Sequence, residues 1–181
     1  SFLGATDGQF CGVIDIGGGS TELGVGQGDK LVCAFSCQMG AVRLFGMQPI
    51  RSHADLAAVQ ELAAGILEDK LREHPTLTLP PRWIGVGGTF TTLAAMVKAI
   101  RWTDRTYMHG TRLTLEQVEK QAWKLADMPL AERLNLPGLQ PNRADIVVHG
   151  ICILLAMMRR LQISEITVSE YGNLDGYLKR R

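Results

Sequence analysis

The sequence lacks the features that would place the protein in a membrane or on a nucleic acid. It has no run of about eighteen apolar residues, and its first residues, Ser1-Phe2-Leu3, do not form the basic and apolar pattern of a secretory signal. Its net charge is only +1, whereas a broad nucleic-acid-binding surface usually makes the whole domain basic. We therefore expect neither a membrane nor a nucleic acid among its partners.

Cysteine is scarce, and its spacing indicates no disulfide framework. The four cysteines show neither C-x-x-C spacing nor the density of a secreted disulfide scaffold; they are Cys11, Cys33, Cys37 and Cys152. Reduced thiols are the ordinary state of such cysteines in a cytosolic protein. We therefore expect free thiols and a cytoplasmic location.

Two groups of ligand-binding motifs are also missing. The four histidines show no H-E-x-x-H or other ligand spacing, so no zinc site is expected. One of them, His149, is predicted to be a packed, hydrogen-bonded residue rather than a base. No G-x-x-x-x-G-K-[ST] sequence is present, and the first glycine cluster lacks the spacing of a dinucleotide fingerprint. P-loop and Rossmann nucleotide sites are therefore excluded.

What is present is the pattern of one globular domain across residues 1–181. With 46% apolar and 20% charged residues, the chain can bury a sizeable core. Short β-rich runs predict a meander at residues 12–16, 21–27 and 31–36, and later strands at 83–86 and 165–169. Helical spacing and capping signals predict helices at 54–72, 89–100, 114–127, 130–134 and 142–161, then a turn at Gly172 and a short closing helix. Strands that first form a meander and later alternate with helices predict an α/β fold with a mixed β-sheet.

The first candidate site is the stretch D-I-G-G-G-S-T-E-L, where three consecutive glycines follow an apolar strand. Because they have no Cβ, Gly17, Gly18 and Gly19 let backbone N–H groups approach a ligand closely and form a nest for anionic oxygens. Ser20 and Thr21 add hydroxyl donors. Phosphate is the ligand that this loop favours, although a tight β-hairpin explains three glycines equally well.

Two carboxylates flank this first loop. Asp15 and Glu22 could hold a divalent cation, directly or through water, because Mg²⁺ favours one or two carboxylates together with phosphate oxygens. A cation also explains why acidic side chains lie beside an anion site. The alternative is that both acids only cap the hairpin.

A second glycine turn follows a predicted strand in G-V-G-G-T-F-T-T-L. Gly87 and Gly88, with Thr89 and Thr91, lie where a helix is expected to begin, and a helix N-terminus favours an anion by about 0.3–1 kcal/mol. An ordinary N-cap with a close-packed turn explains one such junction, but it explains two less easily. Two phosphate loops together predict a polyanionic substrate.

Five motifs occur in order along the chain: D-I-G-G-G-S-T-E-L, M-G-A-V-R-L, V-G-G-T-F-T-T-L-A-A, L-P-G-L-Q-P-N-R-A-D-I-V-V-H-G and T-V-S-E-Y-G. Together they resemble the exopolyphosphatase/guanosine pentaphosphate phosphohydrolase (Ppx/GppA) family of the actin-like ATPase superfamily. The resemblance implies a ribonuclease-H-like lobe, the second of two in the family's catalytic unit. It also implies Mg²⁺-dependent removal of terminal phosphate from inorganic polyphosphate or guanosine pentaphosphate.

The resemblance assigns roles to the two loops and the two acids by position. It implies that Asp15 and Glu22 are associated with the metal, and that residues 17–21 and 87–91 form the phosphate loops. Water would attack a terminal phosphoryl group in line, while metal and backbone dipoles stabilise the charge.

Three further charged residues are candidates for contacts in the same site. Arg43, in M-G-A-V-R-L, and Arg143, in N-R-A-D, are candidate phosphate or interlobe contacts. A surface cation, or an ion pair of Arg143 with Asp145 at a helix start, explains each arginine at least as well. Glu170 could approach the site from the end of the last strand, or it could cap the following turn.

The chain departs from the family pattern in two places. The glutamate that resembles the water-activating base lies in the family's first lobe, before the segment that Ser1 begins, so no catalytic base is expected in this chain. We expect a piece of a longer protein that is nearly inactive alone, with the missing first lobe as its partner and an exposed apolar face that favours a homodimer. Leu174 also stands where relatives often have an arginine.

Two other functions remain open at this point. A kinase or ATPase lobe of the same superfamily also uses glycine-rich hairpins for phosphates, and a non-catalytic module that senses a phosphorylated alarmone would need similar loops. The sequence does not distinguish polyphosphate from guanosine pentaphosphate, because both present the same terminal anhydride.

Overall fold

One mixed β-sheet organises the fold in a computed structural model that describes residues 8–170 of the chain. Its strands are β1 (Phe10–Ile16), β2 (Thr21–Gln27), β3 (Lys30–Cys37), β4 (Trp83–Val86), β5 (Arg112–Thr114) and β6 (Glu165–Ser169). They lie in the order β3-β2-β1-β4-β6-β5. The central strands β1, β4 and β6 are parallel, whereas β2, β3 and β5 join by antiparallel pairing. The predicted meander and mixed sheet are confirmed.

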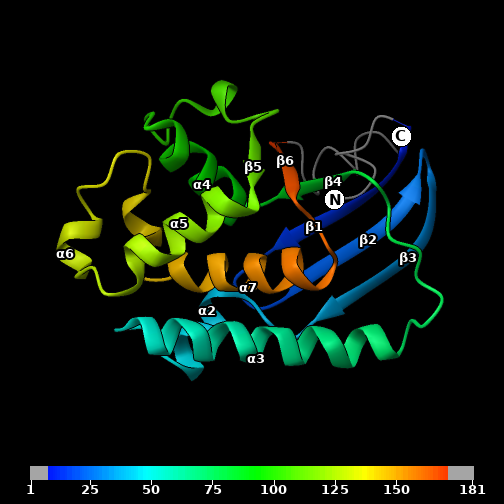
Figure 1. Cartoon of the computed structure of the whole chain (residues 1–181). Coiled ribbons are helices and arrows are strands. Elements are labelled where there is room, and N and C mark those ends of the chain that lie inside the picture. Colours follow the sequence, from blue (N-terminus) through cyan, green and yellow to red (C-terminus); the bar gives the residue numbers. More distant parts are fainter. Residues whose placement is uncertain (1–7, 171–181) are drawn as a thin grey trace.

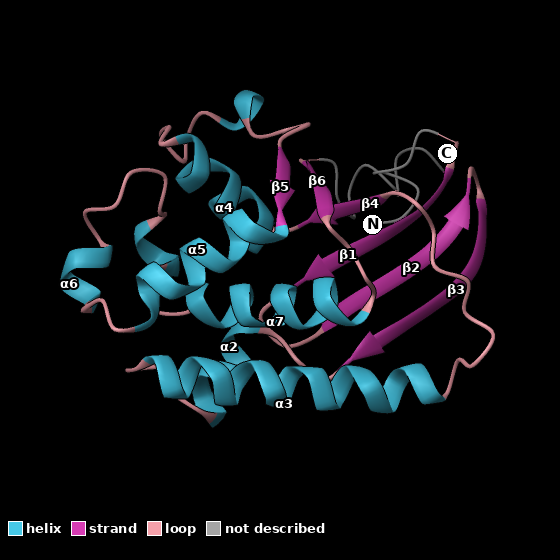
Figure 2. Ribbon diagram, in the orientation of Figure 1, coloured by secondary structure: helices cyan, strands magenta, loops and turns pink. Residues whose placement is uncertain are grey.

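Helices cover one face of this sheet and extend beyond its β5 edge (Figures 1 and 2). They are α2 (Ala41–Met47), α3 (His53–Arg72), α4 (Gly88–Lys98), α5 (Leu115–Ala126), α6 (Leu130–Arg133) and α7 (Val147–Arg160), with 3-10 turns η1 (Arg105–Tyr107) and η2 (Pro141–Arg143). No helix within residues 8–170 is long and apolar enough to cross a bilayer.

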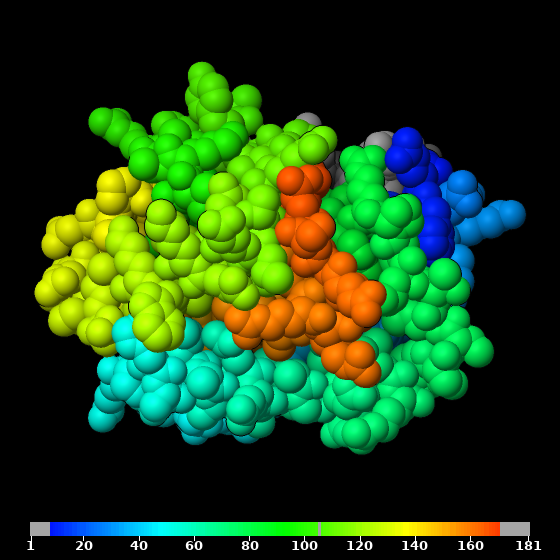
Figure 3. Space-filling model, viewed as in Figure 1, coloured from blue at the N-terminus to red at the C-terminus, as the bar shows by residue number. Residues whose placement is uncertain are grey.

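Local signals explain where the longer helices begin. The hydroxyl of Ser52 accepts the N–H of Asp55 at the start of α3. Thr114 and Gln117 form the predicted capping box at the start of α5. Helix α7 is buried from Val147 to Met158. It packs against both α3 and α5, and Figure 1 shows it between them, in the view that Figure 3 gives in space-filling form. It is the central helix of the core.

The two faces of the sheet are packed differently. Ile14 and Ile16 point into the large core with α3 and α7, whereas Val13 and Val86 belong to a small separate cluster on the other face. Because successive side chains of a strand alternate between faces, Asp15 lies on the face of Val13, away from α3 and α7. This alternation fixes the face on which the first predicted acid lies.

The structure differs from the expectations at short elements and at one helix start. Helix α2 and strand β5 were not expected. The long helix begins at Val147 rather than at 142, because residues 141–143 form a separate 3-10 turn that starts with Pro141. The predicted Gly172 turn, the closing helix and Leu174 lie outside the described residues.

Candidate functional site

The two glycine loops leave the sheet side by side. Strands β1 and β4 are parallel neighbours, and Asp15 pairs with Val86, so the segments that follow both strands emerge at the same edge. Gly87 has a φ of +95°, and a Cβ added there would come within 2.8 Å of Asp15 Oδ1 and 3.3 Å of the Ile16 carbonyl oxygen. The second loop therefore contacts the end of the strand that leads into the first loop.

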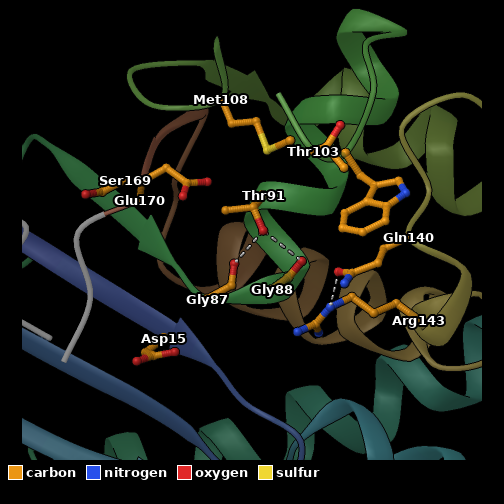
Figure 4. A pocket seen from close by; sticks show the side chains of 11 residues that line it. Asp15, Gly87, Gly88, Thr91, Thr103, Met108, Gln140, Arg143, Ser169 and Glu170 are labelled. Carbon is orange, nitrogen blue, oxygen red and sulfur yellow. Dashed lines mark hydrogen bonds between the residues drawn. The ribbon is translucent and has the colours of Figure 1, made fainter. Parts of the chain in front are cut away.

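A cavity of about 560 Å³ opens at this edge (Figure 4). The ends of β1 and β6 contribute Asp15, Ser169 and Glu170, and the start of α4 contributes Gly87, Gly88 and Thr91; Trp102, Thr103, Met108, Gln140 and Arg143 complete the lining. In open α/β sheets, ligands bind beyond the carboxyl ends of parallel strands. The cavity occupies that position, and Glu170, directly after the last strand, is part of its lining.

Arg143 lies directly on the second loop. A Cβ on Gly88 would overlap the Arg143 guanidinium, so this glycine makes room for the arginine. The side chain is oriented by Gln140, whose Oε1 accepts a hydrogen bond from Arg143 Nε at 3.1 Å (Figure 4). The described residues include no ion pair between Arg143 and Asp145. The approach to Gly88 and the hydrogen bond to Gln140 hold the Arg143 side chain at the wall of the cavity.

The first loop is held from behind by helix α2. The carbonyls of Gly17 and Gly18 accept the N–H groups of Ala41 and Arg43, each at 3.0 Å. The carbonyl of Gly19 accepts from Arg43 Nε at 2.7 Å. Arg43, a candidate phosphate contact, is thus bound to the loop itself.

Two threonines of the predicted phosphate loops turn their hydroxyls toward the interior. Thr21 is fully buried and donates its hydroxyl to the Met39 carbonyl at 2.7 Å. Thr89 is buried against α7, where a Cβ on Gly150 would overlap its hydroxyl. Only the backbone groups of these threonines remain in the predicted loops. Thr91 differs, because its hydroxyl lies 3.4 Å from the Gly87 carbonyl and 3.3 Å from the Gly88 carbonyl while lining the cavity.

The two predicted metal-associated acids lie on one face of the sheet. Asp15 and Glu22 are directly paired across β1 and β2, which places their Cβ atoms about 5 Å apart. Glu22 Oε1 accepts hydroxyls from Ser20 at 2.5 Å and Ser36 at 3.0 Å. Carboxylate oxygens are suitable Mg²⁺ ligands, so this pair fits the cation. Within residues 8–170 the structure has no group of three or more His, Cys, Asp or Glu side chains that could hold a metal ion.

The predicted packing of His149 and the predicted free thiols are confirmed. His149 is buried, and its Nε2 donates to the Gln48 carbonyl at 2.9 Å. Burial lowers the pKa of His149, which keeps the ring neutral. All four cysteines are free, and burial raises the pKa of Cys37 to about 11 and that of Cys152 to about 12.

Sequence reasoning missed the upper wall of the cavity. Trp102, Thr103 and Met108 come from an irregular segment around η1, and Gln140 precedes η2. No motif or periodicity marks Trp102, Thr103 or Met108. Gln140 lies within the fourth motif, three residues before Arg143, and that position could have indicated it.

Comparisons with known proteins agree with the geometry. The model of the Ppx/GppA phosphatase family matches residues 2–180. Exopolyphosphatase 2 of Mycobacterium tuberculosis H37Rv is 32% identical over 184 aligned positions, which cover 96% of this chain and 56% of that protein. The chain therefore spans about half the length of the curated relatives it matches.

Solved structures give the same result. The Aquifex aeolicus PPX-GPPA enzyme superposes with a TM-score of 0.86 at 27% identity and covers 97% of this chain and 58% of its own. An exopolyphosphatase from Cytophaga hutchinsonii superposes with a TM-score of 0.78 at 26% identity, over 96% and 57% of the two chains. With the mixed sheet and its paired glycine loops, these matches show the fold of the actin-like ATPase superfamily, and the chain belongs to the Ppx/GppA phosphatase family.

Proposed function

We propose that this chain supplies one lobe of a Mg²⁺-dependent phosphohydrolase that releases terminal phosphate from inorganic polyphosphate or guanosine pentaphosphate. The observation that carries the proposal is the contact between Gly87 and Asp15, which joins a predicted phosphate loop to a predicted metal-associated acid. Family membership supports hydrolysis of polyphosphate in general. The finer assignments rest on the arrangement of this chain's own residues.

The second loop binds one phosphoryl group in this proposal. Gly87 and Gly88 lie at the start of the eleven-residue helix α4, where unpaired N–H groups and the helix dipole favour an anion. Arg143, lying against Gly88, adds a fixed positive charge and a planar set of donors. A chain of linked phosphates would then continue toward the neighbouring first loop.

Asp15 and Glu22 would hold the magnesium ion between them and the phosphate oxygens. The bound ion would supply neutralisation of charge on the phosphoryl oxygens. Ser20 and Ser36 hold Glu22 in place through its Oε1, and Gly87 leaves the space that Asp15 occupies. The chain's own contribution is therefore to orient two acids toward one position.

The water-activating glutamate and the first lobe lie outside this chain in the proposal. That division rests on the five motifs, which resemble only the second lobe of the family. Loss of a general base typically lowers a rate by about 10²–10⁴. The 181-residue chain should therefore bind substrate but release phosphate very slowly.

Calorimetric titration of the 181-residue chain tests the binding part of the proposal. Tripolyphosphate, ATP and guanosine tetraphosphate are titrated with and without Mg²⁺, and tripolyphosphate should bind only with the ion. Asp15→Asn and Glu22→Gln should each remove the Mg²⁺ dependence, whereas Asp69→Asn, at an exposed position on α3, should leave it unchanged. Tight ATP binding without tripolyphosphate binding would instead support a kinase or ATPase lobe. Binding of guanosine tetraphosphate alone would support a module that senses an alarmone.

A release assay tests the catalytic part separately. Long-chain polyphosphate and Mg²⁺ are incubated with the chain, and free phosphate is measured over hours. Near-absence of release is the expected result. Rapid turnover by the isolated chain would overturn the assignment of the base to another lobe.

A further inference from the structure

The first glycine loop has all three of its glycine carbonyls turned toward the same helix. Gly17 and Gly18 accept N–H groups from the start of α2, and Gly19 accepts the side-chain Nε of Arg43 at 2.7 Å. In a planar trans peptide, the carbonyl and the following N–H point in opposite directions. The N–H groups of Gly18, Gly19 and Ser20 therefore point away from α2.

The direction away from α2 is the direction of the two acids. Helix α2 lies on the helix-covered face, because its Leu44 is buried in the large core and α2 contacts α7. Asp15 and Glu22 lie on the opposite face, as the alternation in β1 and the β1–β2 register require. Three consecutive N–H groups thus face the side on which a Mg²⁺-bound phosphate would lie.

Arg43 binds the one glycine carbonyl of this loop that the backbone of α2 does not hold. The backbone N–H groups of α2 hold the first two carbonyls, and they are available because the first N–H groups of any helix lack an intrahelical partner. The third carbonyl, that of Gly19, depends on the Arg43 side chain. Glycine peptides rotate with little steric resistance, so this unit would otherwise turn easily.

We propose that Arg43 is a positioning residue, which orients the first loop by holding the Gly19 carbonyl and does not itself contact the phosphate. This inference rests on the proposed function, since it names how that phosphate site is oriented. Replacing Arg43 should therefore weaken phosphate binding through lost hydrogen-bond geometry, and loss of positive charge should matter little.

Three substitutions separate the two roles. Arg43→Gln places an amide nitrogen at the position of Nε and removes the charge. Arg43→Lys keeps the charge and places a carbon there. Arg43→Met provides neither, and Arg72→Met on the exposed surface of α3 controls for the loss of one positive charge. Arg43 is exposed, so these variants should keep the wild-type melting temperature.

Calorimetric titration with tripolyphosphate and Mg²⁺ gives the first result. We expect Arg43→Met and Arg43→Lys to weaken binding about tenfold, in line with the loss of one well-placed hydrogen bond. Arg43→Gln should recover most of that loss. Wild-type affinity in Arg43→Lys together with weak binding in Arg43→Gln would overturn the proposal and make Arg43 a direct charge contact.

Amide NMR spectra of the free protein give a second result that needs no ligand. The Gly18, Gly19 and Ser20 resonances should move or broaden in Arg43→Met and Arg43→Lys, and they should stay near wild type in Arg43→Gln. Unmoved resonances in Arg43→Met would contradict the positioning role. If tripolyphosphate does not shift these resonances in the wild-type protein, the proposed phosphate site is wrong. The spectra of the free proteins still decide whether Arg43 positions the loop.

Discussion

The two glycine loops lie at one edge of the sheet but are stabilised in different ways. The second loop begins helix α4, and its conformation follows from Gly87, whose φ of +95° and ψ of 176° suit glycine. The first loop is held by residues more than twenty positions later, in α2. One loop therefore depends on its own residues, whereas the other depends on a short helix behind it.

The strongest way to break the second loop is Gly87→Ala. Its backbone conformation is strained for any other residue, and the new Cβ would press on Asp15 Oδ1 and the Ile16 carbonyl. We expect the free energy of unfolding to fall by about 3 kcal/mol, with loss of Mg²⁺-dependent tripolyphosphate binding. Urea denaturation and calorimetry measure the two effects.

Gly65→Ala provides the control for Gly87→Ala. Gly65 lies within α3, and a Cβ there meets open space. Alanine at this position should stabilise the protein by about 0.5–1 kcal/mol. Equal stability of the Gly87 and Gly65 variants would show that the second loop has no special backbone requirement.

Gly40→Ala, at the N-cap of helix α2, should disrupt the conformation of the first loop. A Cβ on Gly40 would overlap the Gly18 carbonyl group, which is backbone and has little freedom to move. We expect a loss of about 2 kcal/mol in stability and weaker tripolyphosphate binding. Gly46→Ala, in the same helix but with open space around its Cβ, is the matched control and should leave binding intact.

A substitution with a smaller expected effect on stability tests the contribution of the Arg143 charge apart from that of the second loop's backbone conformation. Gly88→Ala would displace only the flexible end of Arg143. Tripolyphosphate affinity should fall about tenfold, while stability changes by less than about 0.5 kcal/mol. In a double-mutant cycle, the losses of tripolyphosphate affinity caused by Gly88→Ala and Arg143→Met should not be additive, because both substitutions remove the same contact. Additive losses in affinity would contradict the placement of Arg143.

Mild acid should affect the first loop more than the second. His149 donates to the Gln48 carbonyl at the end of α2 and meets the Phe45 ring edge-on at 5.4 Å. Burial lowers the pKa of His149 in the folded state, so the unfolded state binds more protons once the pH falls below about 6.5. The contribution of His149 to stability should be constant above that pH and decline below it.

The measurement is amide NMR combined with denaturation between pH 7 and 5. Gly18 and Gly19 resonances should change before those of Gly87 and Gly88. His149→Phe should flatten the pH dependence of the free energy of unfolding, since it removes the titrating group. An unchanged pH profile in that variant would assign the acid sensitivity to other residues.

Sequence patterns located the long elements and both loops because these depend on local signals. Apolar spacing found α3, glycine clusters found the two loops, and Thr114 with Gln117 gave the capping box of α5. Helix α2 escaped prediction because it has seven residues, contains Gly46 and lacks a side-chain N-cap. Its stability comes from packing and from the first loop, which no local pattern records.

Side-chain directions in the site depended on distant contacts and could not be predicted. Thr21 faces inward because Met39 accepts its hydroxyl, and Thr89 because Gly150 opens space on α7. Arg143 lies against Gly88 although the two residues are 55 positions apart in the sequence. The motifs thus located the two loops, whereas tertiary packing decided which hydroxyl and guanidinium groups lie against them.

The register between β1 and β4 also ties the residue at position 87 to the acid at position 15. A Cβ on Gly87 would lie 2.8 Å from Asp15 Oδ1, so the turn after β4 can approach the carboxylate this closely only without a side chain. A glutamate at position 15 would carry its carboxylate one methylene farther along, out of this close approach. Lengthening the acid would therefore separate the two loops' points of contact at the cavity.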